Sequence, residues 1–419
     1  MIKLFKSILF ILFLSTSAFA ETIQLHQMGT LDGATIAASG NNFTVFGSGG
    51  SFSTAEANRQ SLAPTAGTVI RMKAYLATDP ANGAGVQSVT IAIRINGATS
   101  STSCTITEGS TSCQSDVTST YTAGQTLAII QTAANTPTLS RLDVWVWTVD
   151  NTNNQTMHLA STAGTNMSNA AANYYPFVPG NVGNATENLA QVPMPFAGNI
   201  TALYIKLGTF PGVGKQYVFT IYKNGSAVGG NTCTISGGSA TTCNDTVTSL
   251  AFNAGDTITL ESNPGTTPTA TTLRAGILVT NTVGGFMLAG GQSSATSFDG
   301  INNKYHAFSS QGWQATEAAG DVFASQVQIR NLYFEVNTAP DNGAGTQTYT
   351  GTIKNLSGTT GCSCVISEAA VNCNSTCTSD QAAEDKLTFE SVPASTPVGS
   401  GCYFSSWAFI NPRDFFTVN

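Results

Sequence analysis

The chain has few charged residues and few histidines. Only 9% of its 419 residues are Asp, Glu, Lys or Arg, and three are histidine. An ordinary soluble domain has about 25% charged residues. The formal net charge is −7, and an acidic chain gains nothing from the counterion release that drives binding to nucleic acid. We therefore expect no nucleic-acid partner.

Long apolar runs are scarce as well. The run from Ile8 to Leu14 follows Lys3 and Lys6 and precedes Ala18-Phe19-Ala20, which is the pattern of a secretory signal peptide cleaved before Glu21. The run is too short to anchor the chain in a bilayer. The sequence predicts that residues 1–20 are a signal peptide and that no membrane span remains after cleavage. A secreted, extracellular or cell-surface location follows, with the periplasm as the alternative.

Common catalytic motifs are also missing. The sequence contains no H-E-x-x-H, no G-x-S-x-G and no phosphate-binding glycine loop, and these are the patterns that place a metal, a nucleophile or a phosphate on a known scaffold. We expect a protein that is not an enzyme, with no catalytic residues, no cofactor and no bound metal.

A threefold internal repeat organises what is present. Cys104, Cys233 and Cys364 recur at intervals of about 130 residues, each inside a related stretch that reads YKNGSAVGGNTCTI in the second copy. The copies predict module 1 at residues 21–152, module 2 at 153–284 and module 3 at 285–419. Asn, Thr and Gly cluster at both internal boundaries.

Each copy shows the two-residue period of half-buried strands. Val89, Ile91 and Ile93 alternate with smaller or polar residues, and Asn96-Gly97 follows as a hairpin turn signal. One apolar face per strand predicts two sheets packed face to face. The expected fold is all-β, with three tandem antiparallel β-sandwich modules that are jelly-roll-like or, alternatively, immunoglobulin-like.

Two resemblances accompany this pattern. The Ala-Gly-Asp/Gln turn, the strand after it, the Thr-Pro loop and the last strand of each copy, 142–149, 273–279 and 403–410, look like the final strands of tumour-necrosis-factor-like and complement-type globular heads. The motif YKNG…TCTI…TTC…AGDT resembles an uncharacterised tandem β-sandwich repeat of exported bacterial and phage structural proteins. Neither resemblance carries a catalytic residue or an activity.

The cysteines predict disulfides, because export allows them. The expected pairs are Cys104 with Cys113, Cys233 with Cys243, and Cys364 with Cys373, with Cys362 and Cys377 as a nested fourth pair. The alternative for module 3 is a zinc site made by its four clustered thiolates. Cys402 is left over, either as a buried thiol or as a link to a second chain.

Aromatic, histidine and glutamate residues are the remaining candidates for a site. Aromatic rings in the loops could stack on sugars, and this set comprises Tyr174, Tyr175, Phe177, Tyr305, Phe308 and Trp313. Trp145 and Trp147 are expected to fill a sandwich core. His26 and His158 occupy equivalent places, with Met287 as their counterpart in module 3, and are expected to be structural. Glu56, Glu187 and Glu317 recur and are expected to accept backbone hydrogen bonds.

The leading functional hypothesis is a non-enzymatic structural or adhesive protein of the cell surface, an extracellular filament or a matrix. Its partners would be further copies of itself or other surface proteins. In one variant the modules pack about a pseudo-threefold axis; in another they form a rod. The alternatives are an array of carbohydrate-binding modules that uses the loop aromatics, and a glycan-acting hydrolase.

Overall fold

The computed structural model of the chain is all-β, with antiparallel sheets throughout. It describes residues 23–29, 36–47, 52–83, 85–150, 155–178, 183–281, 284–292, 300–306, 308, 313, 315, 321–322, 326–343, 345–355, 358–382 and 385–410. The predicted signal peptide lies outside these residues. Two short 3₁₀ turns, η1 (Glu56–Asn58) and η2 (Glu187–Leu189), interrupt the described strands.

Module 1 contains two facing sheets. The first contains β1 (Ile23–Gly29), β10 (Leu142–Asp150), β4 (Gly67–Leu76) and β7 (Ser112–Ser115) in that order, with β8 (Ser119–Tyr121) also paired to β4. The second contains β2 (Gly40–Val45), β9 (Thr126–Ala134), β5 (Ser88–Ile95) and β6 (Ala98–Thr107), with β3 (Ser61–Leu62) also paired to β9.

Modules 2 and 3 repeat this order. The first sheet of module 2 contains β11 (Gln155–Ser161), β20 (Leu273–Asn281), β14 (Gly198–Leu207) and β17 (Thr242–Asp245), with β18 (Leu250–Phe252) also paired to β14. Its second sheet contains β12 (Asn173–Tyr175), β19 (Thr257–Gly265), β15 (Gly212–Lys223) and β16 (Ser226–Gly237), with β13 (Val192–Pro193) also paired to β19.

The first sheet of module 3 contains β21 (Phe286–Gln292), β29 (Cys402–Ile410), β24 (Val327–Val336) and β27 (Asn372–Gln381). Its second sheet contains β22 (Lys304–His306), β28 (Lys386–Ala394), β25 (Thr348–Asn355) and β26 (Gly358–Ser367), with β23 (Asp321–Val322) also paired to β28.

The order of strands is that of a jelly roll. After β4 the chain crosses to the second sheet for the hairpin β5–β6, returns for β7 and β8, crosses again for β9 and returns for β10. Crossing between sheets in this way makes a double-sheet sandwich, and the strand order differs from that of an immunoglobulin domain. The jelly-roll expectation therefore describes the observed topology better than its alternative.

Local sequence explains the strands. On β5 the alternating Val89, Ile91 and Ile93 are each 0% exposed and fill the space between the sheets, because every second residue of a strand faces the same side. The hairpin that follows turns at Asn96 and Gly97, whose φ angles of 51° and 82° match the tight turn that Asn-Gly favours.

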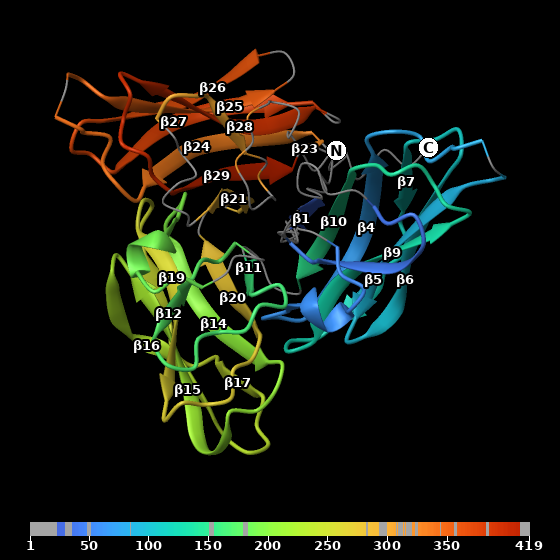
Figure 1. Cartoon of the computed structure of the whole chain (residues 1–419), viewed down its shortest axis with the longest axis horizontal. Helices are drawn as coiled ribbons and strands as arrows, with labels where there is room; N and C mark the ends of the chain where they lie inside the picture. The colour runs from blue at the N-terminus through green and yellow to red at the C-terminus, as the bar shows by residue number, and fades with distance from the viewer. Residues whose placement is uncertain are drawn as a thin grey trace, which may run out of the picture.

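The modules pack in a closed ring rather than a row (Figure 1). Met157 and Leu159 of β11 belong to the buried cluster of module 1, and Met287 of β21 packs against the cluster of module 2. Trp145 and Trp147 of β10 belong to the cluster of module 3. Each core is thus extended by a side chain of another module, and the sequence of contacts returns to its start. A head-to-tail interface repeated three times closes in this manner when the rotation between copies is one third of a turn.

Disulfides join the two sheets of each module along one open edge. Cys104 on β6 bonds to Cys113 on β7, and Cys233 bonds to Cys243 at the same place in module 2. Module 3 has Cys364–Cys373 there, together with Cys362–Cys377. These are the four pairs expected from the spacing.

Candidate functional site

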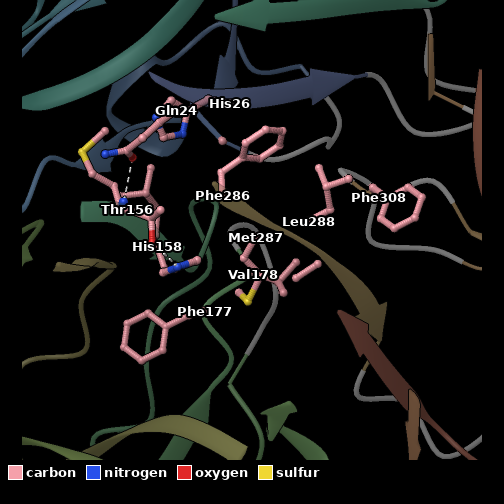
Figure 2. Close-up of a pocket in the computed structure, with 14 residues that line it drawn as sticks. Gln24, His26, Thr156, His158, Phe177, Val178, Phe286, Met287, Leu288 and Phe308 are labelled. Atoms are coloured by element: carbon pink, nitrogen blue, oxygen red, sulfur yellow. Dashed lines mark hydrogen bonds between the residues drawn. The ribbon is translucent and has the colours of Figure 1, made fainter. Parts of the chain in front are cut away.

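A cavity of about 70 Å³ lies where the first strands of the three modules meet (Figure 2). Strands β1, β11 and β21 each contribute side chains to its wall. The wall from β1 and β11 carries polar groups, whereas the wall from β21 is apolar. Because residues of all three modules line this cavity, it marks the centre of the ring, and we consider it first as a candidate site.

Two histidines stand on the polar wall. His26 Nε2 lies 3.0 Å from Thr148 Oγ1, and His158 Nε2 lies 3.0 Å from Thr156 Oγ1. Both histidines are 7% exposed. The two hydrogen bonds differ in origin, since Thr148 comes from the neighbouring strand and Thr156 from the same strand as its histidine.

Burial keeps both imidazoles neutral. It lowers the pKa of His158 to about 4 and that of His26 to about 3, and the proximity of His158 lowers the pKa of His26 further. A neutral imidazole can hydrogen-bond and can bind a metal or a small molecule, but at pH 7 it carries no charge. The centre of the ring therefore contains polar groups without a net charge from its histidines.

The third module breaks the symmetry of this wall. His26 pairs with Val146 and His158 with Ile277, and the corresponding register in module 3 pairs Leu288 with Ser406. The expectation that Met287 is the counterpart of the histidines is therefore wrong by one residue. One residue along a strand exchanges the two faces of the sheet, which explains why alignment of the sequence alone missed it.

Gln24 links two of the modules at the cavity. Its Nε2 donates to Gln155 O at 2.7 Å, and its Oε1 accepts from Met157 N at 2.8 Å. The side chain amide thus pairs with the backbone of β11 as a neighbouring strand would. Gln24 is 2% exposed, so these bonds are shielded from water.

The recurring phenylalanines lie near the same centre. Phe177 and Phe308 line the cavity, and Phe46 packs against His26 with ring centroids 5.1 Å apart. The exposed fractions are 0% for Phe46, 4% for Phe177 and 3% for Phe308. The three phenylalanine side chains pack where the modules meet. The prediction that Phe177 and Phe308 contact a ligand at the surface is wrong because they are buried.

The other predicted aromatic residues fall into two groups. Tyr175 is 2% exposed and belongs to the core of module 2, so it too is unable to act as a surface platform. Trp313 is half-buried and packs on His306, with centroids 4.8 Å apart. Tyr174 and Tyr305 are half-buried on the outer faces of their sheets, and of the six predicted rings these two lie on a strand and stay partly exposed.

The tryptophans of β10 are buried as expected, but in the core cluster of module 3 and not in that of their own module. Trp145 and Trp147 are both 0% exposed, and they form one cluster with Phe286, Leu288 and other residues of module 3. They face away from the interior of their own sandwich, where Val144 and Val146 lie. Their function is to bury the surface between two modules.

The recurring glutamates bind side chains rather than the loop backbone. Glu56 Oε2 accepts from Arg94 Nη2 at 2.7 Å. Glu187 Oε2 accepts from Gln191 Nε2 at 2.7 Å, while its Oε1 is buried without a hydrogen-bond partner among the residues that the structure describes. The third member of the set, Glu317, lies outside the described residues.

Glu187 lies near a second carboxyl group at the contact of modules 2 and 3. Burial raises the pKa of Glu335 to about 7, and the charge of Glu187 raises it further. Burial also raises the pKa of Glu187. Glu335 lines a cavity of about 60 Å³ with Pro193 and Gly255 of module 2. Sequence reasoning missed Glu335, because nothing in one copy indicates which residues of another module it will meet.

The cysteines of module 3 leave no thiolates for zinc. Cys362, Cys364, Cys373 and Cys377 are all in disulfides, so the zinc alternative is wrong. Cys402 is free and 0% exposed, and burial raises the pKa of its thiol. A link to a second chain through Cys402 would require this part of β29 to open.

The described part of the chain shows no group of three or more His, Cys, Asp or Glu side chains placed to hold a metal ion. Nor does it contain a helix of the length and hydrophobicity needed to cross a bilayer. The four disulfides fit a secreted or extracellular protein, because such bonds persist in oxidising compartments.

Comparison with known proteins gives no relative from which a role could be transferred. No protein-family model matches the chain, and no curated protein matches its sequence. Conclusions about function therefore depend on the geometry described above.

Proposed function

We propose that the protein is a non-enzymatic exported head, a structural or adhesive component of a cell surface, filament or matrix. The observation that carries the proposal is the closed ring of three related sandwiches. A chain whose cores are completed by neighbouring modules behaves as one rigid body. Such a body holds three related outer surfaces in fixed directions, and linked weak sites on those surfaces gain avidity without any new contact.

The chemistry of the central cavity supports a structural role for the centre. Its histidines are neutral and hydrogen-bonded to threonines, and Gln24 uses both ends of its amide to bind the neighbouring module. The threonines fix the two imidazoles within their own modules, and the bonds of Gln24 strengthen the contact between modules 1 and 2. Catalysis instead requires a nucleophile, a base and an orienting group that converge on one point.

The burial of Tyr175, Phe177 and Phe308 weakens the alternative of a carbohydrate-binding array, because half of the aromatic rings proposed to stack on sugars face the interior. A glycan-acting hydrolase would need two carboxyl groups about 5–10 Å apart that flank a substrate cleft. Glu187 and Glu335 lie near each other at the contact of modules 2 and 3, and this place suits a role in assembly.

Antibody labelling tests the proposal together with electron microscopy. Antibodies raised against the purified chain from Glu21 onward should label intact source cells or their matrix. Negative-stain images at increasing protein concentration should show ordered assemblies or particles attached to surface material. If labelling requires cell lysis and the particles remain dispersed at every concentration, the proposal is wrong.

A further inference from the structure

A repeated group of side chains lies on the outer face of the second sheet in each module. The residues at its three positions come from three adjacent strands, and strand register identifies the equivalents. In module 1 the three positions hold Phe43, Ile130 and Arg94. In module 2 they hold Tyr174, Glu261 and Tyr222, and in module 3 they hold Tyr305, Glu390 and Lys354.

In modules 1 and 3 the chain places its own cation over the ring. Arg94 Cζ lies 5.8 Å from the centroid of Phe43, and Lys354 Nζ lies 5.7 Å from the centroid of Tyr305. A cation within about 6 Å of an aromatic face is attracted to it. In module 3 the ammonium group also lies 3.7 Å from Glu390 Oε2. In module 3 the group thus consists of a ring, a carboxylate and a cation that is attracted to both.

Module 2 has the ring and the carboxylate but a second ring in place of the cation. Tyr174 and Tyr222 meet edge to face, with centroids 5.4 Å apart and an interplanar angle of 79°. Tyr174 Oη donates to Glu261 Oε1 at 3.4 Å. The next basic residue along β15 is engaged elsewhere: Lys223 Nζ donates to Ala251 O at 3.0 Å and lies 3.9 Å from Asp256 Oδ2.

The carboxylate in module 2 is not a requirement of the fold. Glu261 is 8% exposed, and a buried carboxylate is costly unless a cation or several hydrogen bonds compensate for its lost hydration. Module 1 builds the same sheet with Ile130 at this register, where it packs with Phe43 and Ala92. A hydrophobic residue at this register is therefore compatible with the sandwich, and Glu261, which both Tyr174 and Tyr222 hydrogen-bond, supplies a carboxylate that the fold itself does not require.

The negative charge of Glu261 acts on both tyrosine hydroxyls. Burial raises the pKa of Tyr222 to about 12, and the charge of Glu261 is the next cause. Burial also raises the pKa of Tyr174, with the charges of Glu261 and Glu187 adding to it. Both rings are half-buried and so remain accessible from solvent.

We propose that Tyr174, Tyr222 and Glu261 form a binding site for an organic ammonium group, which supplies the positive charge that Lys354 supplies in module 3. Two tyrosine rings and a carboxylate are the groups that recognise a quaternary or primary ammonium. Such a group can belong to a choline-type small molecule or to a lysine side chain of a partner protein. This site is independent of the proposed structural role, because a single chain in solution would show it.

Titration with small probes, followed by NMR, tests the site. Choline should bind to the purified chain saturably, and 3,3-dimethylbutanol, its neutral analogue of similar shape, should bind about tenfold more weakly or not at all. Nα-acetyl-lysine amide, titrated in parallel, distinguishes the two sources: tighter binding of choline indicates a quaternary ammonium ligand, and tighter binding of the lysine derivative indicates a protein partner.

Variants that exchange the modules' residues make the test specific. Tyr222→Lys supplies an internal cation and should lower the affinity for choline about tenfold or more. Lys354→Tyr should create a second site beside Glu390, a gain that misfolding is unable to produce. Arg94→Tyr combined with Glu56→Gln is the matched control and should create no site, because the carboxylate that binds Arg94 at 2.7 Å is then neutralised and Ile130 supplies no charge.

Thermal melting and far-UV circular dichroism establish that each variant is folded. Should Tyr222→Lys fail to fold, Glu261→Gln removes the charge and keeps the shape, and it should also weaken choline binding. Equal binding of choline and its neutral analogue, or wild-type affinity in a folded Tyr222→Lys or Glu261→Gln variant, would overturn the proposal.

Discussion

Two of the contacts that close the ring fill the space between their modules in opposite ways. At the contact of modules 1 and 3, Trp145 on β10 is completely buried in the cluster of module 3. The equivalent residue at the contact of modules 1 and 2 is Gly276 on β20, where a Cβ would overlap Leu62 O and lie 3.0 Å from Pro64 Cδ. The tryptophan side chain fills the contact of modules 1 and 3, whereas at the contact of modules 1 and 2 the two backbones approach each other directly.

The polar contacts differ as well. The side chain of Arg274 on β20 donates to Ala57 O, and Arg59 donates to Ala163 O, so arginines fasten module 1 to module 2. At the contact of modules 2 and 3, Tyr403 Oη donates to Leu189 O at 3.4 Å instead. The comparison teaches that the ring preserves the positions of its contacts while the residues that make them change, as expected when three copies diverge within one chain.

The largest effect should come from the tryptophan contact. Trp145→Ala leaves a cavity between modules 1 and 3 and should lower the free energy of unfolding by about 3–5 kcal/mol, measured by urea denaturation. Leu139→Ala is the control, since Leu139 is 54% exposed and its loss should change stability little. A small effect at Trp145 would show that this contact does not stabilise the ring.

The glycine contact should respond to the smallest possible enlargement. Gly276→Ala forces β3 away from β20 and should cost about 2–3 kcal/mol. Gly229→Ala is a matched control, because a Cβ there meets nothing within 4 Å. Equal unfolding midpoints for the two variants would contradict the close approach of modules 1 and 2.

The amide contact should have a smaller effect. Gln24→Leu keeps the approximate volume but leaves Met157 N–H without its acceptor, and it should cost about 1–2 kcal/mol. Hydrogen exchange of the Met157 amide gives a local measurement and should become faster. The exposed Gln114 provides the control variant, Gln114→Leu. Unchanged exchange at Met157 would count against the link seen at the cavity.

The carboxyl pair between modules 2 and 3 should make stability depend on pH. Because burial raises the pKa of Glu335 from 4.5 to about 7, the folded chain retains a proton that the unfolded chain releases between these values. The unfolding free energy should therefore fall as the pH rises from about 4.5 to 7, and this contribution should be constant above that range.

Urea denaturation at pH 5 and pH 8 measures this dependence. Glu335→Gln should reduce the difference between the two pH values, whereas Glu108→Gln, which changes an exposed carboxyl group, should leave it as it is in the wild type. Glu187 is the charged group whose proximity raises the pKa of Glu335, and Asn372 and Tyr403 lie beside Glu335 on the adjacent strands. An identical pH dependence in Glu335→Gln would contradict this interpretation.

The sequence predicts the parts of this structure that local chemistry controls. Alternation of residues such as Val89 and Ile91 indicates strands, and the recurring cysteines indicate bonds between them. Contacts between modules are not encoded in one copy. The sequence therefore showed that Trp145 is buried but not which core receives it, and it placed the counterpart of the histidines at Met287 instead of Leu288.

The outer-face group could have been found from the sequence with more careful alignment. Register brings Arg94, Tyr222 and Lys354 into one column, where two cations and one tyrosine stand out. The same alignment relates Thr102, whose Oγ1 donates to Val117 O at 2.7 Å, to Cys362 in module 3, which is joined to Cys377 by a disulfide. A hydrogen bond in module 1 and a disulfide in module 3 thus fasten equivalent segments of the chain, and comparison of the copies reveals both substitutions.

Small-angle X-ray scattering of the purified chain from Glu21 onward tests the closed ring most directly. The ring predicts a compact particle with a radius of gyration of about 21 Å, as expected for a globular protein of this length, and a single-peaked distance distribution. A clearly larger radius of gyration, with a distance distribution that extends into the long tail of a rod, would contradict the account.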